Sequence, residues 1–320
     1  MRIVRVHDYG EPEAMKVEYM GPPEPTAGMV RVKVEAIGVN FIDIYQRSGL
    51  YRPALPFTPG QEAAGVVDMV GENVHNFKVG DRVAYSFTIG AYAEYTIVPA
   101  EKMVHVPDGV DSRTAAALML QGMTAHYLVT DTYQVHSGQT ILIHAAAGGT
   151  GSLVVQMAKL RGARVLGTVS SDEKAKLARE AGADEVFLYD DFDTEVKRLT
   201  NGYGVDVVYD SVGKDTFDRS LNCLRPRGYM VLFGQSSGPV PPFDPQLLNS
   251  KGSLFLTRPT LGNYTATSDE IQYRAAAIFE LAQSGKLNVR IDRALPLEQA
   301  PEAHRALSSR ETTGKVLLVI

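Results

Sequence analysis

The chain has 320 residues, of which 44% are hydrophobic and 22% charged, and its formal net charge is −5. This composition predicts a globular protein long enough for two domains, and the acidic balance argues against a nucleic-acid surface as its main function. One cysteine, Cys223, permits neither an internal disulfide framework nor a cysteine-built zinc site. No signal peptide or apolar run long enough to span a bilayer is visible, so we expect a cytoplasmic protein.

The chain up to Gly109 has the pattern of a β-rich domain. Short runs of alternating apolar residues are separated by turns rich in proline, glycine and asparagine, which predicts strands. These strands are expected at residues 30–36, 64–70, 82–86 and 94–98. Short strands with frequent turns are typical of a small barrel or sandwich. From residue 112 to 133 the pattern becomes helical.

After Gly138, predicted strands and helices alternate. The candidate strands are residues 140–144, 164–169, 185–188, 206–209, 229–233 and 254–257. The helical stretches between them are residues 153–161, 172–181, 194–200 and 216–224. This alternation predicts a parallel sheet covered by helices on both faces. We expect a later helix at 269–284 and a final strand at 315–320 to fold back onto the N-terminal domain.

A glycine-rich turn stands at the head of this alternation. Residues 138–151 are G-Q-T-I-L-I-H-A-A-A-G-G-T-G, an apolar run followed by small residues, glycines and the start of a helix. Glycines let the backbone approach a pyrophosphate, and the unpaired N–H groups at a helix start face the anion. Ala146 replaces the first glycine of the usual spacing, and such a turn can also be purely structural. Its place after the first of six strands favours a dinucleotide site.

The residues after the second predicted strand indicate which dinucleotide is bound. A site that selects NAD normally ends this strand with an acid that binds the ribose hydroxyls. Here Ser170 and Ser171 follow the strand, and Lys174 lies one helical turn later. Hydroxyls and a cation suit a 2′-phosphate, so we predict NADPH, with Asp172 as the N-cap of the next helix. The alternative is that Ser170 and Ser171 only open that helix.

Motifs spread over the chain resemble one family. The pattern G-Q-x-x-L-x-x-x-A-A-G-G-T-G-x-x-x-x-Q-x-x-K, from Gly138 to Lys159, resembles the signature of the ζ-crystallin/quinone oxidoreductase family. That family belongs to the medium-chain dehydrogenase/reductase superfamily. The resemblance continues in A-I-G-V-N-F-I-D at 36–43, P-G-Q-E-A-A-G at 59–65, G-D-R-V at 80–83, Q-G-M-T-A at 121–125, V-Y-D-S-V-G at 208–213 and T-R-P at 257–259. The resemblance covers essentially all 320 residues, and it is a resemblance to bacterial NADPH:quinone reductases in particular.

The resemblance implies an α/β protein with an N-terminal GroES-like β-barrel catalytic domain and a doubly wound Rossmann cofactor domain. We expect the catalytic domain at residues 1–125 and 265–320, and the NADPH-binding domain at residues 126–264. The family is usually dimeric through pairing of the edge strands of two cofactor sheets. Residues 254–257 are the candidate edge strand for a homodimer.

Two positions separate the chain from the zinc-dependent branch of that superfamily. Asn40 stands where that branch has a cysteine ligand, and Gln61 stands where it has a histidine ligand. The lobe of structural cysteines is missing between Val83 and Gly90. An amide does not replace a thiolate or an imidazole as a strong zinc ligand. None of the seven histidines has convincing metal spacing, so we expect no metal.

Without a metal, the expected chemistry is hydride transfer to an acceptor that is already electrophilic, such as a quinone. The catalytic candidates implied by the resemblance are Asn40, Tyr45, Tyr51 and Gln61. Asn40 and Gln61 would hydrogen-bond a quinone oxygen, while Tyr45 or Tyr51 would stack on the ring or donate a proton. We expect the site in a cleft between the two domains. Alternatively, Asn40 caps a turn and the tyrosines are packing residues.

The resemblance also assigns residues to the cofactor. The nicotinamide end receives Asn40, Phe41, Asp43, Tyr45 and Tyr127. The pyrophosphate receives Gly148, Gly149, Thr150 and Gly151, and the 2′-phosphate receives Ser170, Ser171, Lys174 and Tyr189. Residues expected to open toward the cofactor or its phosphates are Phe233, Gly234, Ser236, Arg258 and Lys315. A buried helix tyrosine is the alternative for Tyr127, and a solvated lysine is the alternative for Lys315.

Three functions stay open on the sequence alone. The leading hypothesis is a zinc-independent NADPH:quinone reductase, with a quinone and a second copy of the chain as partners. The second is an NADPH-dependent enone or alkenal double-bond reductase on the same scaffold. The third is an NADPH-binding protein with a structural or RNA-binding role. The net charge of −5 and the absence of a Lys/Arg cluster count against RNA binding.

Overall fold

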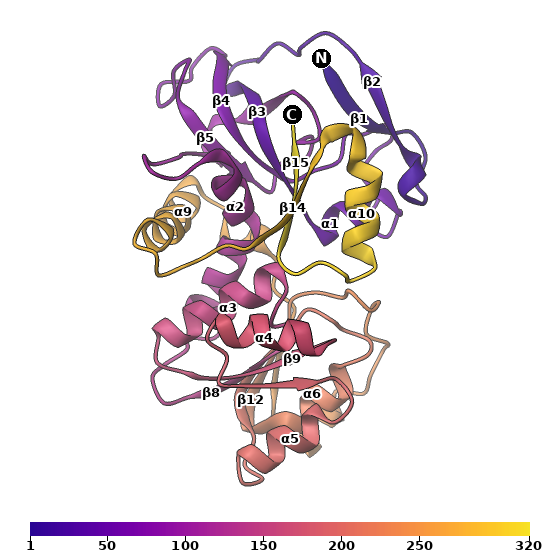
Figure 1. Cartoon of the computed structure of the whole chain (residues 1–320), viewed down its shortest axis with the longest axis vertical. Coiled ribbons are helices and arrows are strands. Elements are labelled where there is room, and N and C mark those ends of the chain that lie inside the picture. The colour runs from indigo at the N-terminus through magenta and orange to yellow at the C-terminus, as the bar shows by residue number, and fades with distance from the viewer. The chain divides into compact units, whose positions relative to one another are not determined.

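The computed structural model describes all 320 residues, and the chain forms two compact units (Figure 1). The first comprises Met1–Met123 and Tyr264–Ile320, so two segments that are far apart in the sequence fold together. The second comprises Thr124–Asn263. No helix combines the length and the apolar character needed to cross a membrane.

The first unit is built on a seven-stranded sheet with the order β14-β15-β3-β4-β5-β7, in which β6 also pairs with β3. Its strands are β3 (Met29–Val39), β4 (Glu62–Val70), β5 (Arg82–Ser86), β6 (Tyr95–Pro99), β7 (Met103–His105), β14 (Ile291–Pro296) and β15 (Lys315–Val319). The pairing of β14 with β15 is parallel, and the other pairings are antiparallel. A separate hairpin-like sheet joins β1 (Arg2–Val6) to β2 (Met15–Tyr19).

Strand β3 runs beyond its predicted end. Alternating burial supports the prediction over its first part, but its last four residues, through Val39, are all buried. Residues that point to opposite faces are thus both covered here, and β15 pairs alongside, with Val316 opposite Val39 and Leu317 opposite Gly38. A strand whose two faces are both covered has no polar face, so the two-residue period fails there.

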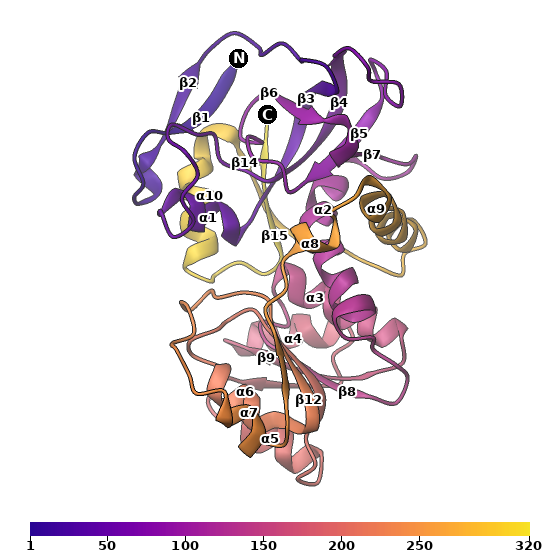
Figure 2. The same cartoon turned by 180° about the vertical axis from the view of Figure 1, so that it is seen from behind.

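The first unit also contains helices that the sequence pattern did not predict. These are α1 (Phe41–Arg47) and α10 (Ala300–Ser308), which lie beside one another (Figure 2). The predicted helices are α2 (Ser112–Tyr127), which continues as a π-helical turn at Leu128–Thr132, and α9 (Ser268–Gln283). The remaining helical segments are η1 (Pro12–Ala14), η2 (Ala100–Lys102) and η4 (Leu297–Gln299), while α8 (Leu261–Tyr264) is at the point in the chain where the second unit ends. Short helices of about two turns offer too few periods to detect.

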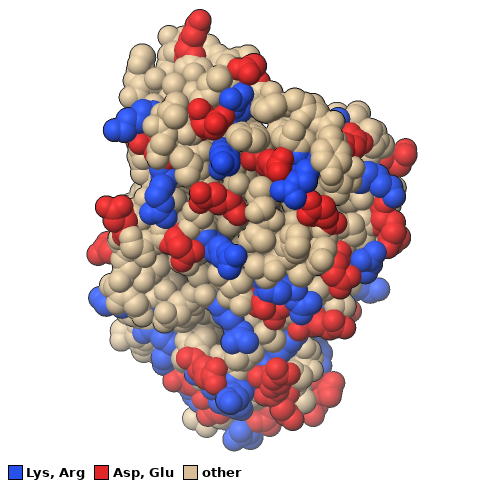
Figure 3. Space-filling view, turned by 45° about the horizontal axis from the view of Figure 1, so that its top comes forward, with Lys and Arg blue, Asp and Glu red and all other residues tan.

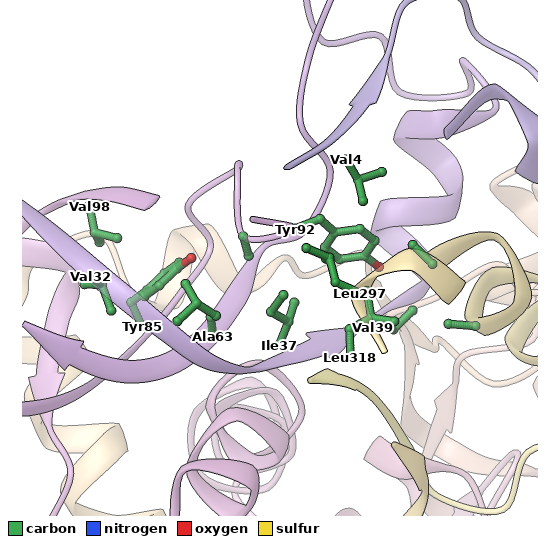
Figure 4. Close-up of a cluster of buried hydrophobic side chains, with 14 of the residues drawn as sticks. Val4, Val32, Ile37, Val39, Ala63, Tyr85, Tyr92, Val98, Leu297 and Leu318 are labelled. Atoms are coloured by element: carbon green, nitrogen blue, oxygen red, sulfur yellow. The ribbon is translucent and has the colours of Figure 1, made fainter. Parts of the chain in front are cut away.

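The core of the first unit lies against its large sheet and joins the two chain segments. Figure 4 shows side chains from β3, β4 and β5 together with Leu297 and Leu318 from the later segment. Two tyrosines, Tyr85 and Tyr92, are fully buried among these aliphatic side chains. The later segment is therefore an integral layer of this unit, because its apolar residues complete the same core.

The second unit is a six-stranded parallel sheet with the order β10-β9-β8-β11-β12-β13. Its strands are β8 (Thr140–Ile143), β9 (Arg164–Val169), β10 (Glu185–Leu188), β11 (Val205–Asp210), β12 (Leu224–Leu232) and β13 (Phe255–Thr257). Its helices are α3 (Gly149–Leu160), α4 (Asp172–Glu180), α5 (Phe192–Leu199), α6 (Phe217–Cys223) and α7 (Gln246–Ser250). All six predicted strands are present, and the order reverses between β8 and β11 as in a doubly wound fold.

Candidate active site

The N-terminus of α1 places Asn40 at the end of β3. Asn40 has extended dihedral angles and is the N-cap of α1, and its backbone N–H donates to Asp43 Oδ2 at 2.9 Å. A carboxylate at this third helical position satisfies one otherwise unpaired group and complements the helix dipole. The alternative that Asn40 caps a turn therefore agrees with its backbone, which caps α1.

The side chain of Asn40 is fully engaged inside the first unit. Its Nδ2 donates to Glu62 Oε1 at 2.7 Å and to the Gly38 carbonyl at 3.3 Å, and its Oδ1 accepts from Lys315 Nζ at 2.9 Å. An amide has two N–H donors, so none is left for a quinone oxygen. The side chain is also only 4% exposed. The predicted hydrogen bond from Asn40 to a quinone oxygen stays a prediction, and it would have to replace one of these two contacts of Nδ2.

Glu62 and Lys315 form an ion pair in which both side chains are fully excluded from solvent. Glu62 Oε2 also accepts the backbone N–H of Leu120 in α2 at 2.5 Å. Gly38 makes room for this carboxylate, because a Cβ at that position would lie 2.0 Å from Glu62 Oε1. A buried ion pair is tolerated only when further hydrogen bonds satisfy its groups, and Asn40 and Leu120 supply them.

This pair bears on Lys315 and adds a residue. Lys315 is fully buried, so the alternative of a solvated lysine is wrong, and its ammonium group is held by Glu62 and Asn40. Glu62 was not among the predicted site residues. The available signal was an acid directly after Gln61, at the head of a strand whose neighbours are apolar.

Asp43, which the resemblance assigns to the nicotinamide end, is fully buried. Its Oδ2 accepts from the Asn40 N–H and from the Tyr92 hydroxyl, the latter at 3.1 Å. Burial raises the pKa of Asp43 to about 7, and the nearby Glu62 carboxylate acts in the same direction. The Asn40 N–H, Lys315 and Tyr92 oppose this shift. Asp43 is thus poised to change charge near neutral pH.

The aromatic candidates come together along α1 and the following loop. The rings of Phe41 and Tyr45 are 6.1 Å apart, and the ring of Tyr51 meets that of Tyr45 edge-on at 5.4 Å. The backbone N–H of Tyr51 donates to the Tyr45 carbonyl at 2.9 Å, which fixes the loop on the helix. Tyr51 is 41% exposed, so the residue contacts Tyr45 and is also open to solvent in part.

Gln61 differs from Asn40 in having an uncommitted amide. It is 6% exposed and follows Gly60, whose positive φ of 94° turns the chain into β4. No side-chain hydrogen bond holds the Gln61 amide, whereas every N–H of the Asn40 amide is used. Of the two predicted amide donors, Gln61 alone retains donors for an acceptor oxygen.

The glycine-rich turn of the second unit connects β8 to α3. Ala145 has a positive φ of 52°, and Gly148 is the extended N-cap residue of α3 with no side chain capping the helix. Gly151 in the first turn allows a close approach, since a Cβ there would lie 2.1 Å from the Ala145 carbonyl oxygen. Gly149 and Thr150 are partly exposed. The first N–H groups of α3 are therefore arranged to bind an anion.

Buried polar side chains support this turn from below. His144, at the end of β8, is fully buried between the hydroxyls of Thr168 and Ser220, at 2.7 and 2.8 Å. Burial lowers the pKa of His144, so the imidazole is neutral near pH 7. The Ala145 N–H donates to the Tyr189 hydroxyl at 3.0 Å. Tyr189, expected around a 2′-phosphate, thus also anchors the turn itself.

The hydroxyls and lysine after β9 lie at the same edge of the sheet as the turn. Strands β8 and β9 are parallel neighbours, so their carboxyl ends coincide. Ser171 is the N-cap of α4, and its Oγ accepts the Lys174 N–H at 3.3 Å. Asp172 is the first residue of the helix, so the prediction that it is the N-cap is wrong. Ser170 is exposed just beyond the strand.

The segments after β11, β12 and β13 are bonded to one another at this edge. The Phe233 N–H donates to the Asp210 carbonyl at 2.8 Å, and the Ser236 N–H donates to the Ser211 carbonyl at 3.0 Å. Arg258 donates from Nη1 to the Leu232 carbonyl at 3.1 Å. Gly234 packs closely, since a Cβ there would lie 2.6 Å from the Ser211 carbonyl oxygen.

Two further expectations concern Tyr127 and metal binding. Tyr127 is 1% exposed at the end of α2, as in the alternative of a buried helix tyrosine. No three His, Cys, Asp or Glu side chains lie together in a way that would hold a metal ion. At the two positions compared with zinc ligands, the side chains are the amides of Asn40 and Gln61.

Comparison with known proteins identifies the family. Two family models match, the alcohol dehydrogenase GroES-like domain over residues 26–108 and the zinc-binding dehydrogenase over residues 149–277. The quinone oxidoreductase of Pseudomonas aeruginosa is 48% identical over 315 residues, which are 97% of each chain. The chain belongs to the quinone oxidoreductase family. The predicted fold class, a GroES-like unit and a Rossmann-type parallel sheet, is confirmed.

Two other members and relatives of the quinone oxidoreductase family bear on function. The Escherichia coli quinone oxidoreductase complexed with NADPH superimposes with a TM-score of 0.98 at 42% identity, and 100% of each chain is covered. The 2-haloacrylate reductase of a Burkholderia species is 42% identical over 324 residues, which are 98% of this chain and 97% of the relative.

Proposed function

We propose that the chain is an NADPH-dependent quinone reductase that transfers hydride from NADPH to a quinone without a metal. The observation that carries the proposal is the anion-binding turn at the start of α3, flanked by Ser170, Ser171 and Lys174, in a chain similar throughout to quinone oxidoreductases. The E. coli relative solved with NADPH supports the same cofactor.

The residues of the second unit fit this cofactor. The N–H groups at the start of α3 would bind the pyrophosphate, and the absence of a Cβ at Gly151 keeps the turn tight enough to do so. Ser170 and Lys174 would bind the 2′-phosphate through a hydroxyl and a cation. Ser171, whose Oγ already accepts the Lys174 N–H, would contribute its hydroxyl proton. Bound NADPH would supply the hydride.

The residues of the first unit would bind and orient the acceptor. The partly exposed Tyr51, whose ring contacts that of Tyr45, suits stacking on a quinone ring. The uncommitted amide of Gln61 would donate to a quinone oxygen, where negative charge develops as the hydride arrives. Quinone reduction to a hydroquinone takes one hydride and one proton, and the hydroxyl of Tyr45 or Tyr51 would deliver that proton.

The donor set argues for a mechanism without zinc. Asn40 and Gln61 carry neutral amides, and the Asn40 amide is saturated by Glu62, Gly38 and Lys315. Amides bind zinc weakly compared with thiolates and imidazoles. Metal analysis of the purified protein is expected to find no stoichiometric zinc, and a chelator is expected to leave turnover unchanged. Zinc at one equivalent, lost together with activity on chelation, would contradict this mechanism.

The 42% identity to a 2-haloacrylate reductase supports a second candidate, an enone or alkenal double-bond reductase. Such a reaction would send the hydride to an activated carbon instead of a quinone. Oxidation of NADPH should be followed with phenanthrenequinone, benzoquinone, a 2-alkenal and 2-chloroacrylate. The leading proposal expects turnover with the quinones, and turnover with the alkenal or chloroacrylate alone would overturn it.

A nucleic-acid-binding role has less support. Figure 3 shows acidic and basic side chains interspersed over the visible face, without a continuous basic patch. A phosphate-binding surface of that kind concentrates Lys and Arg on one side. The net charge of −5 points the same way.

The domain roles, assembly and location belong to the same proposal. Residues 1–125 and 265–320 would bind the acceptor, and residues 126–264 would bind NADPH. Strand β13 is at the edge of its sheet, and Phe255 on it is 50% exposed, which suits pairing with a second copy. Sedimentation analysis is expected to give a homodimer. We propose a cytoplasmic location, which fractionation of the source cells would test.

A further inference from the structure

A buried chain of hydrogen bonds links α10 to the N-terminus of α1. His304 Nε2 lies 2.9 Å from the Tyr92 hydroxyl, which donates to Asp43 Oδ2 at 3.1 Å. The same carboxylate oxygen accepts the Asn40 N–H at 2.9 Å. His304, Tyr92 and Asp43 are fully buried, and Asn40 is 4% exposed. Three segments far apart in the sequence are thus joined by polar groups without access to water.

The direction of these hydrogen bonds fixes the tautomer of His304. Tyr92 has one hydroxyl proton, and it is directed to Asp43. The Tyr92 oxygen must therefore accept its other hydrogen bond, so the proton on His304 resides on Nε2. Burial lowers the pKa of His304 to about 3, and the Arg47 charge acts in the same direction. His304 is consequently a neutral donor at physiological pH.

Ring packing and backbone hydrogen bonds hold Tyr92 in place. Its ring occupies the space of an absent side chain at Gly60, where a Cβ would lie 2.3 Å from a ring carbon. Its backbone N–H donates to Pro59 at 3.0 Å, and its carbonyl accepts from Val4 at 2.9 Å. The His304 ring packs edge-on against the Tyr92 ring at 5.8 Å. Because Gly60 precedes Gln61, Tyr92 contacts both segments that carry acceptor-binding candidates.

We propose that Tyr92 and His304 are positioning residues that fix the first turn of α1 through Asp43, and so place Tyr45 and Gln61 for hydride transfer. The inference rests on the proposed quinone reductase function. Helix α1 has seven residues, too few to be stable without tertiary support. Loss of these hydrogen bonds would leave the Asp43 carboxylate without one of its two donors, and the first turn of α1 would open more often.

The decisive comparison is Tyr92→Phe against Tyr85→Phe. Both tyrosines are fully buried in the same core, and each substitution removes one hydroxyl, but only that of Tyr92 joins α10 to α1. Amide hydrogen exchange of residues 41–48 is expected to accelerate about tenfold in Tyr92→Phe and to stay at the wild-type rate in Tyr85→Phe. With a quinone, kcat is expected to fall about tenfold in Tyr92→Phe alone, with KM for NADPH unchanged.

Substitutions at His304 test the end of this series of hydrogen bonds that is farthest from α1. His304→Leu should reproduce the effects of Tyr92→Phe, whereas His304→Gln retains an N–H near Nε2 and should restore most of kcat. Equal effects of Tyr92→Phe and Tyr85→Phe on α1 exchange, or failure of glutamine to rescue, would overturn the inference. If wild type oxidises no NADPH with any quinone, the proposed function fails. The exchange experiment then still decides whether the hydrogen bonds from His304 through Tyr92 to Asp43 position α1.

Discussion

Lys315 and Glu62 are 253 positions apart in the sequence and form an ion pair that is fully excluded from solvent. The pair joins β15 to β4 and also binds the side chain of Asn40. The ion pair therefore connects the two chain segments, Met1–Met123 and Tyr264–Ile320, that build the first unit. Because neither charge can reach water, removing one leaves the other without compensation.

Lys315→Met is expected to lower the free energy of unfolding by about 3–5 kcal/mol, because the Glu62 carboxylate then stays buried without a cation. The double variant Lys315→Met with Glu62→Gln should recover part of that loss, since a neutral amide costs less to bury. Chemical denaturation of the wild type, both single variants and the double variant measures this coupling. Strictly additive losses would show that the two groups do not depend on one another.

Lys174→Ala is expected to raise KM for NADPH by about ten- to a hundredfold, the effect of losing a hydrogen bond between charged groups. KM for NADH should change little, because NADH has no 2′-phosphate. Lys176→Ala is the matched control, since Lys176 is on the same helix and its side chain is 80% exposed. Steady-state kinetics with both cofactors gives the result, and equal losses for the two would contradict the 2′-phosphate role.

Gln61→Leu is expected to lower kcat/KM for a quinone by about tenfold, the effect of one lost hydrogen bond to the acceptor oxygen. Stability should change by less than about 1 kcal/mol, because the Gln61 amide makes no hydrogen bond within the protein. Asn40→Leu provides the contrast. Its amide binds Glu62 and Lys315, so its loss should destabilise the fold as well. Comparing kinetics with thermal unfolding separates the two effects.

Asp43 and His304 impose opposite pH dependences on the free energy of unfolding. Burial raises the pKa of Asp43 from 3.8 to about 7, so the folded protein keeps a proton that the unfolded chain releases. This contribution falls as pH rises between those values. Burial lowers the pKa of His304 from 6.5 to about 3, so the unfolded chain binds a proton first and stability falls as pH drops through that range. The two slopes oppose one another between about pH 4 and pH 6.

Single substitutions should expose each slope. In Asp43→Asn, the slope of stability against pH over this window is expected to become more positive than in the wild type by up to about 1.4 kcal/mol per pH unit, because the opposing contribution of Asp43 is removed. In His304→Gln, the slope is expected to become more negative than in the wild type by a similar amount, while the contribution of His144 is the same in all three proteins. Urea denaturation at several pH values measures the slopes, which do not depend on the absolute loss of stability. Two variants with the slope of the wild type would refute the assignment of these groups.

The parts of the fold that local sequence could predict are those with a local cause. All six strands of the second unit and its glycine-rich turn follow from a repeating apolar pattern and from glycine chemistry. The N-cap of α4 was assigned to Asp172 because aspartate and serine are about equally good caps, and only the backbone of Ser171 decides between them.

The buried polar residues of the site depend on distant partners. Nothing in the local sequence distinguishes Lys315 from a solvated lysine. Only the pairing of β15 with β3 brings it to Glu62 and Asn40. Likewise, the sequence shows His304 only as one of seven histidines without metal spacing, because its pattern does not predict α10. Family resemblance assigned Asn40 and Asp43 to the nicotinamide end. It did not indicate that protein groups occupy their side chains.

The pairing of β3 with β15 also has a consequence during synthesis. Strand β3 and Glu62 leave the ribosome long before β15, and in that interval the Glu62 carboxylate has no ammonium group to balance it. The second unit is continuous in the chain and can fold as soon as its own strands are made. The first unit must wait. A translation product that stops before Lys315 would retain the glycine-rich turn but would lack the cation on which the Asn40 and Glu62 cluster is built.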